Sequence, residues 1–239
     1  MSWFQETPTP SLELMELVGA ARGSAIIDIG GGASRLVDAL IERGFSDLTV
    51  LDLSAAALAA ARNRLGPKSD QVAWFAADIT VWEPSRTYDV WQDRAAFHFL
   101  TEPADQTAYV EHLRRALRHG GHAIIGTFAP DGPEKCSGLP VARHDAASVQ
   151  ALLGSGFALV DSRRHDHLTP SGATQRFQFS IGACLVNRGS RNARKRIRRS
   201  YGDGGGSLPL VVTPPGPNQA CRRPSGIPPK LAEGFAPTR

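Results

Sequence analysis

The sequence predicts an α/β fold in which helices pack on a mostly parallel β-sheet, and three observations carry this prediction. Residues 25–29 form a short run rich in β-branched side chains, end in three glycines and lead into residues 35–41, whose apolar positions repeat at helical spacing. Two further apolar runs, residues 47–52 and 71–79, also end near an aspartate. Residues 174–181 alternate polar and apolar side chains, which is typical of an antiparallel strand.

The composition is that of a globular chain with a buried core. Its 239 residues are 41% hydrophobic and 21% charged. We expect one catalytic domain, residues 1–186, and an appendage, residues 187–239. No apolar run has the length needed to span a bilayer, and the amino terminus lacks the pattern of a leader peptide, so we expect a cytoplasmic protein without membrane contact. The three cysteines lie far apart and indicate neither a disulfide framework nor a zinc site.

The first helix is predicted to begin near Ser11, which can cap it, and the glycine turn follows. Gly30, Gly31 and Gly32 let the backbone approach a ligand closely, and the start of the next helix offers free N–H groups to an anion. A nucleotide-like cofactor is therefore the first hypothesis. The dinucleotide pattern GxGxxG fits only in part, because Arg35 occupies the position of its last glycine.

Aspartates stand at the ends of the first three predicted strands. Asp28 lies two residues before the first glycine, Asp52 closes the second strand and Asp78 closes the third. An acid about 20 residues after the glycines is placed to accept the hydroxyl groups of a ribose. Because the carboxyl ends of parallel strands meet at one edge of a sheet, we expect the three carboxylates to converge there.

The pattern Asp28-x-Gly30-x-Gly32 resembles motif I of the class I S-adenosylmethionine-dependent methyltransferases. The resemblance covers about residues 3–181 and implies a Rossmann-like sheet of seven strands, mostly parallel with the last strand antiparallel, and helices on both faces. It also implies roles for the residues at this edge. The glycines would hold the methionine end of the cofactor and Asp28 its ammonium, Asp52 with Leu53 the ribose, and Asp78 with Ile79 the adenine.

The fourth predicted strand and the segment after it, residues 88–100, would face the methyl group in this family. The run Asp-Arg-Ala-x-Phe-His-Phe-Leu resembles a subgroup of bacterial methyltransferases of undefined substrate. Asp93, Arg94 and His98 are therefore the candidate active-site residues, and Asp93 is also a candidate cofactor ligand. His98 could accept a proton from the nucleophile or be a buried, hydrogen-bonded residue. Arg94 could hold an anionic substrate group or pair with Asp93 or Asp89.

The remaining elements follow in order. We expect a helix over 102–118, a turn at 119–121, a strand over 122–128, a substrate-side loop over 129–141, a helix over 145–153, a strand over 157–162 and a polar connection over 163–167. His165 and His167 in that connection flank Asp166, but we expect no metal there. Trp3 and Phe4 could fold over the cofactor or anchor the first helix.

The composition changes after residue 186. Residues 188–199 carry seven Arg or Lys, and residues 200–239 contain 7 Gly and 8 Pro, so this appendage is expected to be disordered. A nucleic-acid partner is not favoured, because the basic segment lacks interleaved aromatic residues. The prediction is therefore a methyltransferase that uses S-adenosylmethionine and acts on a small-molecule or protein nucleophile. A nicotinamide-dependent oxidoreductase and a non-catalytic binder with a nucleic-acid-binding tail are the alternatives.

Overall fold

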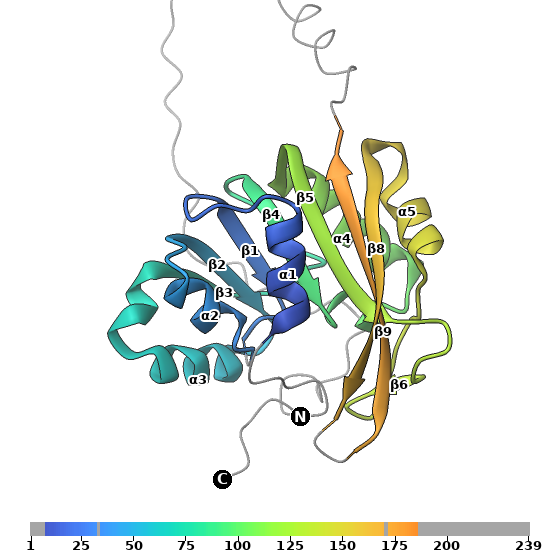
Figure 1. Ribbon diagram of the computed structural model, residues 1–239, viewed down its shortest axis with the longest axis horizontal. Coiled ribbons are helices and arrows are strands. Elements are labelled where there is room, and N and C mark those ends of the chain that lie inside the picture. Colours follow the sequence, from blue (N-terminus) through green and yellow to red (C-terminus); the bar gives the residue numbers. More distant parts are fainter. Residues whose placement is uncertain (1–7, 33, 170–171, 186–239) are drawn as a thin grey trace, which may run out of the picture. The chain divides into compact units, whose positions relative to one another are not determined.

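The computed structural model describes residues 8–32, 34–169 and 172–185. Its long strands form one seven-stranded sheet in the order β3-β2-β1-β4-β5-β9-β8, with parallel pairing from β3 through β5 and antiparallel pairing on both sides of β9 (Figure 1). This confirms the predicted fold class. The helices and strands are α1 (Thr9–Leu17), β1 (Ala25–Ile29), α2 (Leu36–Glu42), β2 (Asp47–Asp52), α3 (Ala55–Leu65), β3 (Val72–Ala76), β4 (Tyr88–Arg94), α4 (Pro103–Ala116), β5 (Leu117–Phe128), β6 (Lys135–Cys136), β7 (Leu139–Pro140), α5 (Ala146–Leu153), β8 (Phe157–Leu168) and β9 (Thr174–Cys184).

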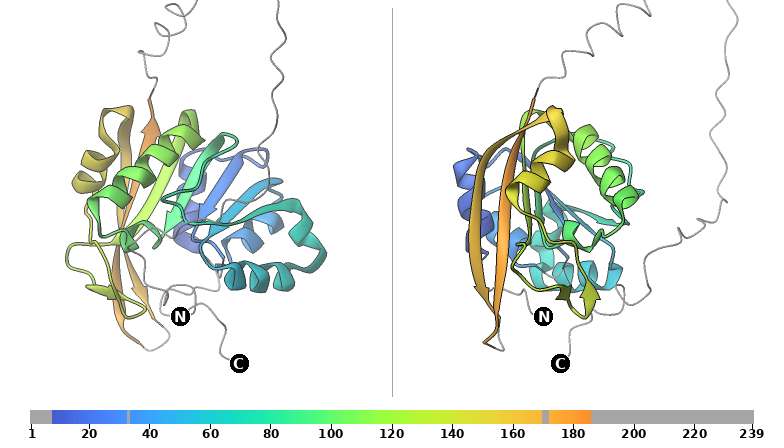
Figure 2. Two further views of the ribbon diagram at one scale, coloured as in Figure 1. Left: turned by 180° about the vertical axis from the view of Figure 1, so that it is seen from behind. Right: turned by 90° about the vertical axis from the view of Figure 1, so that its right-hand side faces the viewer.

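Two apolar layers bury the faces of the sheet. On one face Leu12 of α1 and Leu40 of α2 join a cluster that contains Ile26, Val90 and Ile124. On the other face the apolar residues of α4 and α5 cover a second cluster, and Figure 2 shows these two helices on the side opposite α1. Because strand side chains alternate between faces, the central strands are apolar in both directions, as expected of a sheet covered on both sides.

The helix starts reveal one error in the prediction. The Ser54 hydroxyl caps α3 and accepts a hydrogen bond from Ala57 N at 3.1 Å. Ser11, in contrast, does not cap α1, which begins two residues earlier at Thr9. The Ser11 side chain is buried inside the helix and accepts a hydrogen bond from Gln92 Nε2 of β4 at 3.1 Å. Ser11 therefore ties α1 to the sheet.

Two strands are longer than predicted because pairing with a neighbour extends them. β5 begins at Leu117, so the expected turn at 119–121 lies within the strand, beside a register irregularity between Tyr88 and Val90. The expected polar connection at 163–167 belongs to β8, which pairs with β9 as far as Leu168. The polar residues in this part of β8 fit an edge strand, whose solvated side tolerates charge.

Several predictions concern segments that these ranges leave out. Trp3, Phe4 and the appendage after residue 186 lie outside the described residues. Among the helices of the described ranges, none combines the length and the apolar character that crossing a membrane requires.

Candidate functional site

The carboxyl ends of four neighbouring parallel strands lie level with one another. Ile29 of β1 is opposite Leu51 of β2 and Asp93 of β4, and Leu51 is in turn opposite Phe75 of β3. The residues that follow these positions therefore meet at one edge of the sheet. This is the edge at which open α/β sheets bind their ligands.

The glycine turn fits against its neighbours without space for side chains. Gly30 has a φ of +70°, a conformation that favours glycine, and its N–H donates to Leu51 O at 2.7 Å. A Cβ on Gly31 would lie 2.2 Å from Asp28 Oδ2. A Cβ on Gly32 would lie 2.9 Å from Asp52 Oδ2. The backbone of the turn therefore packs directly against the Asp28 and Asp52 carboxyl groups.

Asp28 is a buried carboxyl group with only 5% of its surface exposed, and its Oδ2 atom has no hydrogen-bond partner among the described residues. Burial raises its pKa to about 8, although the positive charge of Arg94 opposes this shift. Burial also lowers the pKa of Arg94, and Asp28 opposes that change. Arg94 therefore has Asp28 as its electrostatic neighbour, whereas the sequence suggested Asp93 or Asp89.

The geometry of β4 explains this difference. Asp93 precedes Arg94 and so points to the opposite face of the sheet. Asp89 lies near the other end of β4, where it accepts hydrogen bonds from Arg118 Nη1 at 2.8 Å and from Ala25 N at 2.8 Å. Asp28 is opposite Gln92, two residues before Arg94, so Asp28 and Arg94 extend from the same face.

Asp52 connects the end of β2 to both flanking turns. Its Oδ2 accepts a hydrogen bond from Gly32 N at 3.0 Å, and its Oδ1 accepts one from Ser54 N at 2.7 Å. Burial raises the pKa of Asp52, and these two N–H groups oppose the shift. The next residue, Leu53, exposes 40% of its surface at the same edge and offers a flat ligand an apolar contact.

Asp78 lies just beyond β3 in a turn next to Asp52. The N–H of Ala77 donates to Asp52 O at 3.0 Å, which positions the start of this turn. Asp78 Oδ1 accepts hydrogen bonds from the Thr80 N–H and hydroxyl, at 2.9 and 2.7 Å. Ile79 is half-buried and packs against the apolar cluster of the α4 face. The predicted Asp78 and Ile79 pair therefore follows the edge strand next to Asp52.

Asp93 is fully buried, and its carboxyl group organises the turn after β4. It accepts hydrogen bonds from the N–H groups of Ala96 and Phe97, at 2.9 and 3.1 Å, and from the Tyr109 hydroxyl at 2.8 Å. Trp91 Nε1 donates to the same hydroxyl at 2.7 Å. Burial raises the pKa of Asp93 to about 6 despite these donors. Asp93 is thus a positioning residue, and its partner Tyr109 could not be identified from sequence because α4 lies far along the chain.

We expect Tyr109→Phe to destabilise the protein by roughly 2 kcal/mol at pH 8, because the ionised Asp93 and the Trp91 N–H both lose a buried partner. The folded pKa of Asp93 lies above its unfolded value, so its carboxylate is increasingly ionised as the pH rises through about 6. The loss should therefore be smaller at pH 5. Urea unfolding at both pH values measures it.

The matched control for this experiment is Tyr88→Phe. Tyr88 is also buried, but among the described residues its hydroxyl group donates no hydrogen bond to a carboxylate. Its destabilisation should be the same at pH 5 and pH 8. Equal pH dependence in the two variants would contradict the role given to Asp93.

His98 occupies a different environment from the one that a catalytic base requires. It is completely buried, its ring contacts Phe99 and Phe128 with centroid distances of 4.7 and 4.8 Å, and Phe128 N donates to its Nδ1 at 3.4 Å. Burial lowers its pKa to about 3. A proton acceptor has to be within reach of the nucleophile. The burial of His98 therefore favours the alternative of a buried, hydrogen-bonded residue, and His98 packs the ends of β4 and β5 together.

Two other histidines border this edge, and no sequence motif had assigned them to it. His165 and His167 lie two residues apart in β8 and so share a face. Their rings contact Phe179 and Phe177 of β9, each at a centroid distance of 6.3 Å. Arg94 and Glu13 act electrostatically on His165, which brings β8 to the Arg94 side of the site. Within the described ranges, no three His, Cys, Asp or Glu side chains are arranged to hold a metal ion.

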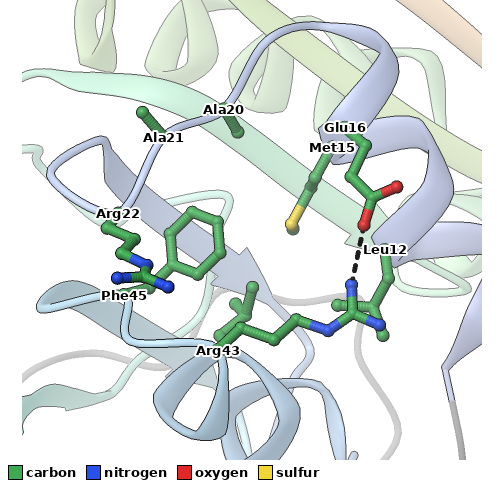
Figure 3. A pocket seen from close by; sticks show the side chains of 9 residues that line it. Leu12, Met15, Glu16, Ala20, Ala21, Arg22, Arg43 and Phe45 are labelled. Atoms are coloured by element: carbon green, nitrogen blue, oxygen red, sulfur yellow. Dashed lines mark hydrogen bonds and ion pairs between the residues drawn. The ribbon is translucent and has the colours of Figure 1, made fainter.

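A separate hollow lies away from this edge, between the ends of α1 and α2. It has a volume of about 590 Å³ and is lined on its apolar side by Leu12, Met15 and Phe45 (Figure 3). Arg43 crosses it and forms an ion pair with Glu16 at 3.0 Å. Phe45 and the segment before β1 lie at the amino ends of the strands, so this hollow is not part of the site at the carboxyl edge.

Comparison with known proteins shows which proteins this part of the chain resembles. Residues 27–123 match the family described as a methyltransferase domain. This range runs from β1 into β5, so it includes the carboxyl edge described above but neither β8 nor β9. Over these residues the chain is therefore similar to methyltransferase domains. The chain is 31% identical over 118 residues to the malonyl-[acyl-carrier protein] O-methyltransferase of Paenibacillus sp.. The matched stretch covers 47% of this chain and 42% of that protein.

A second curated relative and a solved structure extend the comparison over about three quarters of the chain. The ubiquinone biosynthesis O-methyltransferase of Alkalilimnicola ehrlichii is 26% identical over 188 residues, which cover 78% of this chain and 66% of that protein. The chain thus spans less than two thirds of either relative. The 1,6-didemethyltoxoflavin-N1-methyltransferase of Burkholderia thailandensis, solved with S-adenosylhomocysteine, superposes with a TM-score of 0.61 at 21% identity and covers 75% of this chain and 78% of that one.

Proposed function

We propose that this chain transfers the methyl group of S-adenosylmethionine to a nucleophile. The observation that carries the proposal is the buried Asp28 carboxyl group directly beneath the Gly31 backbone, with one oxygen that has no partner in the described part of the chain. A buried polar group without a partner is costly, and a ligand ammonium would supply that partner. The backbone at Gly31 and Gly32 packs directly against the Asp28 and Asp52 carboxyl groups, so side chains are excluded at both positions.

The other edge residues have matching chemistry for the rest of this cofactor. Asp52 has two oxygens that each accept one backbone N–H and keep further lone pairs, which could accept the ribose hydroxyl groups, with Leu53 in apolar contact. Asp78 uses Oδ1 for Thr80, and its Oδ2 is available to the adenine amino group, with Ile79 beside the ring. We assign Arg94 to the cofactor side and Asp93 to support of the adjoining turn.

The chemistry requires little from the protein beyond alignment. When bound, the cofactor supplies a sulfonium that makes its methyl group electrophilic. The chain's own residues would hold the amino-acid end at Asp28 and the nucleoside end at Asp52 and Asp78, so that a nucleophile approaches in line and water is excluded. The hydrogen bonds that Asp93 accepts from Ala96 and Phe97 would keep the segment after β4 in position.

For the acceptor we propose an oxygen nucleophile on a small molecule or on a group carried by a protein. Both curated relatives are named as O-methyltransferases. The loop over 129–144 would contribute to selectivity, since it closes over β4 and β5 through hydrogen bonds from Ala142 N to His98 O at 2.7 Å and from His144 N to Phe128 O at 2.9 Å. A cytoplasmic location and a division into residues 1–186 and an appendage remain parts of this proposal.

Calorimetric titration with S-adenosylmethionine, S-adenosylhomocysteine and NAD tests the proposed function. We expect the first two to bind and NAD not to bind. Asp52→Ala should weaken both by about 10- to 100-fold, because charge-assisted hydrogen bonds to the ribose and the bond to Gly32 are lost. Binding of NAD alone would favour the oxidoreductase alternative.

The matched control is Asp47→Ala at the opposite end of β2, where the Asp47 carboxylate pairs with Arg86 at 2.5 Å on the surface. Its cofactor affinity should equal that of the unmodified protein. A chain that ends at residue 186 should also bind with unchanged affinity if the domain division is correct. Equal weakening by Asp47→Ala and Asp52→Ala would exclude a specific role for Asp52.

A further inference from the structure

The hollow between the ends of α1 and α2 has no part in the site at the carboxyl edge. Its apolar lining consists of Leu12, Met15 and Leu40, which are buried, and of the half-buried ring of Phe45 (Figure 3). Its volume of about 590 Å³ lies in the range of small-molecule sites. Such sites combine an apolar lining with a few polar groups that orient the ligand. The hollow therefore has the size and the lining of a ligand site.

Hydrogen bonds between backbone atoms fix the segments that border this hollow. Phe45 N donates to Leu40 O at 3.0 Å, which ties the residue to the end of α2, and Ser46 N donates to Arg22 O at 3.2 Å. A Cβ on Gly44 would lie 3.4 Å from Arg22 Cδ and from Arg22 Nε. The Arg22 side chain therefore packs over the Gly44 backbone, and its guanidinium is held beside the apolar lining.

The charged groups of the hollow are two guanidinium groups and one carboxylate. Arg43 pairs with Glu16 at 3.0 Å, and the two side chains are 44% and 72% exposed, so this pair contributes little to stability. Arg22 forms no ion pair with any residue that the structure describes. The lining thus carries one excess positive charge, on a group whose parallel N–H donors match a carboxylate.

We propose that this hollow binds an amphipathic monocarboxylate, which is a molecule with one carboxylate group and a hydrocarbon body. The carboxylate would pair with Arg22, and the hydrocarbon body would cover Leu12, Met15 and Phe45. A cationic amphiphile would instead meet two guanidinium groups, and a small anion would leave the apolar lining in contact with water. Because the hollow lies apart from the carboxyl edge, this inference does not depend on the proposed function.

Calorimetric titration of the 239-residue chain with hexanoate, octanoate and decanoate, each below its critical micelle concentration, tests the proposal. Each added CH₂ that enters the hollow should raise the affinity about four-fold. Octyltrimethylammonium, which has the same chain length as octanoate and the opposite charge, should bind at least about 10-fold more weakly than octanoate. Equal affinity for these two ligands, or no binding of any carboxylate, would overturn the proposal.

Two exposed residues allow the charge of the hollow to be changed in opposite directions. Arg22→Gln should weaken octanoate about 5- to 10-fold and leave 1-octanol unchanged, because only the carboxylate loses a partner. Arg22→Lys should keep part of the affinity, since it keeps the charge and loses the paired donors. Glu16→Gln should strengthen octanoate about two- to three-fold, because Arg43 is released and a negative charge is removed.

Arg62→Gln is the matched control, since Arg62 is exposed on α3 and forms no ion pair within the described part of the chain. It should bind octanoate as the unmodified protein does. Phe45→Ala should weaken octanoate and 1-octanol alike, because both ligands lose the same apolar contact. Unchanged octanoate affinity in Arg22→Gln, or equal weakening in Arg22→Gln and Arg62→Gln, would place the binding elsewhere and refute the inference.

Discussion

Gly31→Ala is expected to reduce the affinity for S-adenosylmethionine by at least about 100-fold. The new Cβ would stand 2.2 Å from Asp28 Oδ2 and 2.6 Å from its Cγ, far inside van der Waals contact. Because the Asp28 carboxyl group is the movable partner, it should rotate away from the turn and lose its place beside the ammonium. The protein should still fold, so calorimetric titration at matched protein concentration measures the loss.

Gly23→Ala is the control for a general effect of replacing glycine. No heavy atom lies within 4 Å of a Cβ at Gly23, and its φ is not positive, so alanine fits there without strain. This variant should bind the cofactor with unchanged affinity and be at least as stable as the unmodified protein. Retention of full affinity by Gly31→Ala would show that the Asp28 carboxyl group does not contact the ligand.

Asp28→Asn is expected to lower cofactor affinity and at the same time to raise stability near neutral pH. The pKa of Asp28 is about 8 in the folded protein, so the free protein holds a proton on this group at pH 7. Binding of an ammonium requires the ionised form, and the affinity of the unmodified protein should therefore rise between pH 6 and pH 8 with release of a proton. Titration in two buffers of different ionisation enthalpy measures this release, which should vanish in Asp28→Asn.

The sign of the stability change follows from linkage. The folded pKa of Asp28, about 8, lies far above that of an unperturbed aspartate, so the folded state binds the proton more tightly and stability is lost as the pH rises from about 4 to about 8. Removing the group should leave stability at pH 4 nearly unchanged and raise it at pH 8 by on the order of a few kcal/mol. Thermal unfolding across this range measures the effect.

Asp70→Asn provides the comparison, because Asp70 is exposed. Its unfolding curve should follow that of the unmodified protein at every pH. If Asp28→Asn is destabilising at pH 8, the Asp28 carboxylate already has a strong partner without ligand, and the account of a group kept ready for an ammonium is wrong.

The edge residues could be predicted because their signals are local. A glycine turn after an apolar strand, and an aspartate at the end of each following strand, are features of a few adjacent residues. The parallel pairing that lines up Ile29, Leu51 and Asp93 then brings them together. The resemblance to the class I methyltransferases implied a seven-stranded sheet whose last strand is antiparallel. The structure confirms this sheet, with β9 as the antiparallel strand.

The partners of these residues could not be predicted because they depend on which face a side chain occupies. Arg94 interacts with Asp28 across two strands, and Asp93 with Tyr109 of α4, and neither pairing has a sequence signal. The polar residues 163–167 were predicted to be a connection but belong to β8, because an exposed edge strand and a loop have similar compositions. His98 lies between two phenylalanines, and that context did suggest burial as one alternative.

The two bonds that shape the glycine turn both come from the end of β2. Gly30 N donates to Leu51 O and Gly32 N donates to Asp52 Oδ2, about 20 residues later in the chain. The turn can therefore adopt its final shape only after β1 and β2 have paired, a contact that first has to close the loop containing α2. Competence to bind the cofactor is thus a property of the assembled β1–α2–β2 unit, and a nascent chain that ends before Asp52 would lack it although it already contains every glycine.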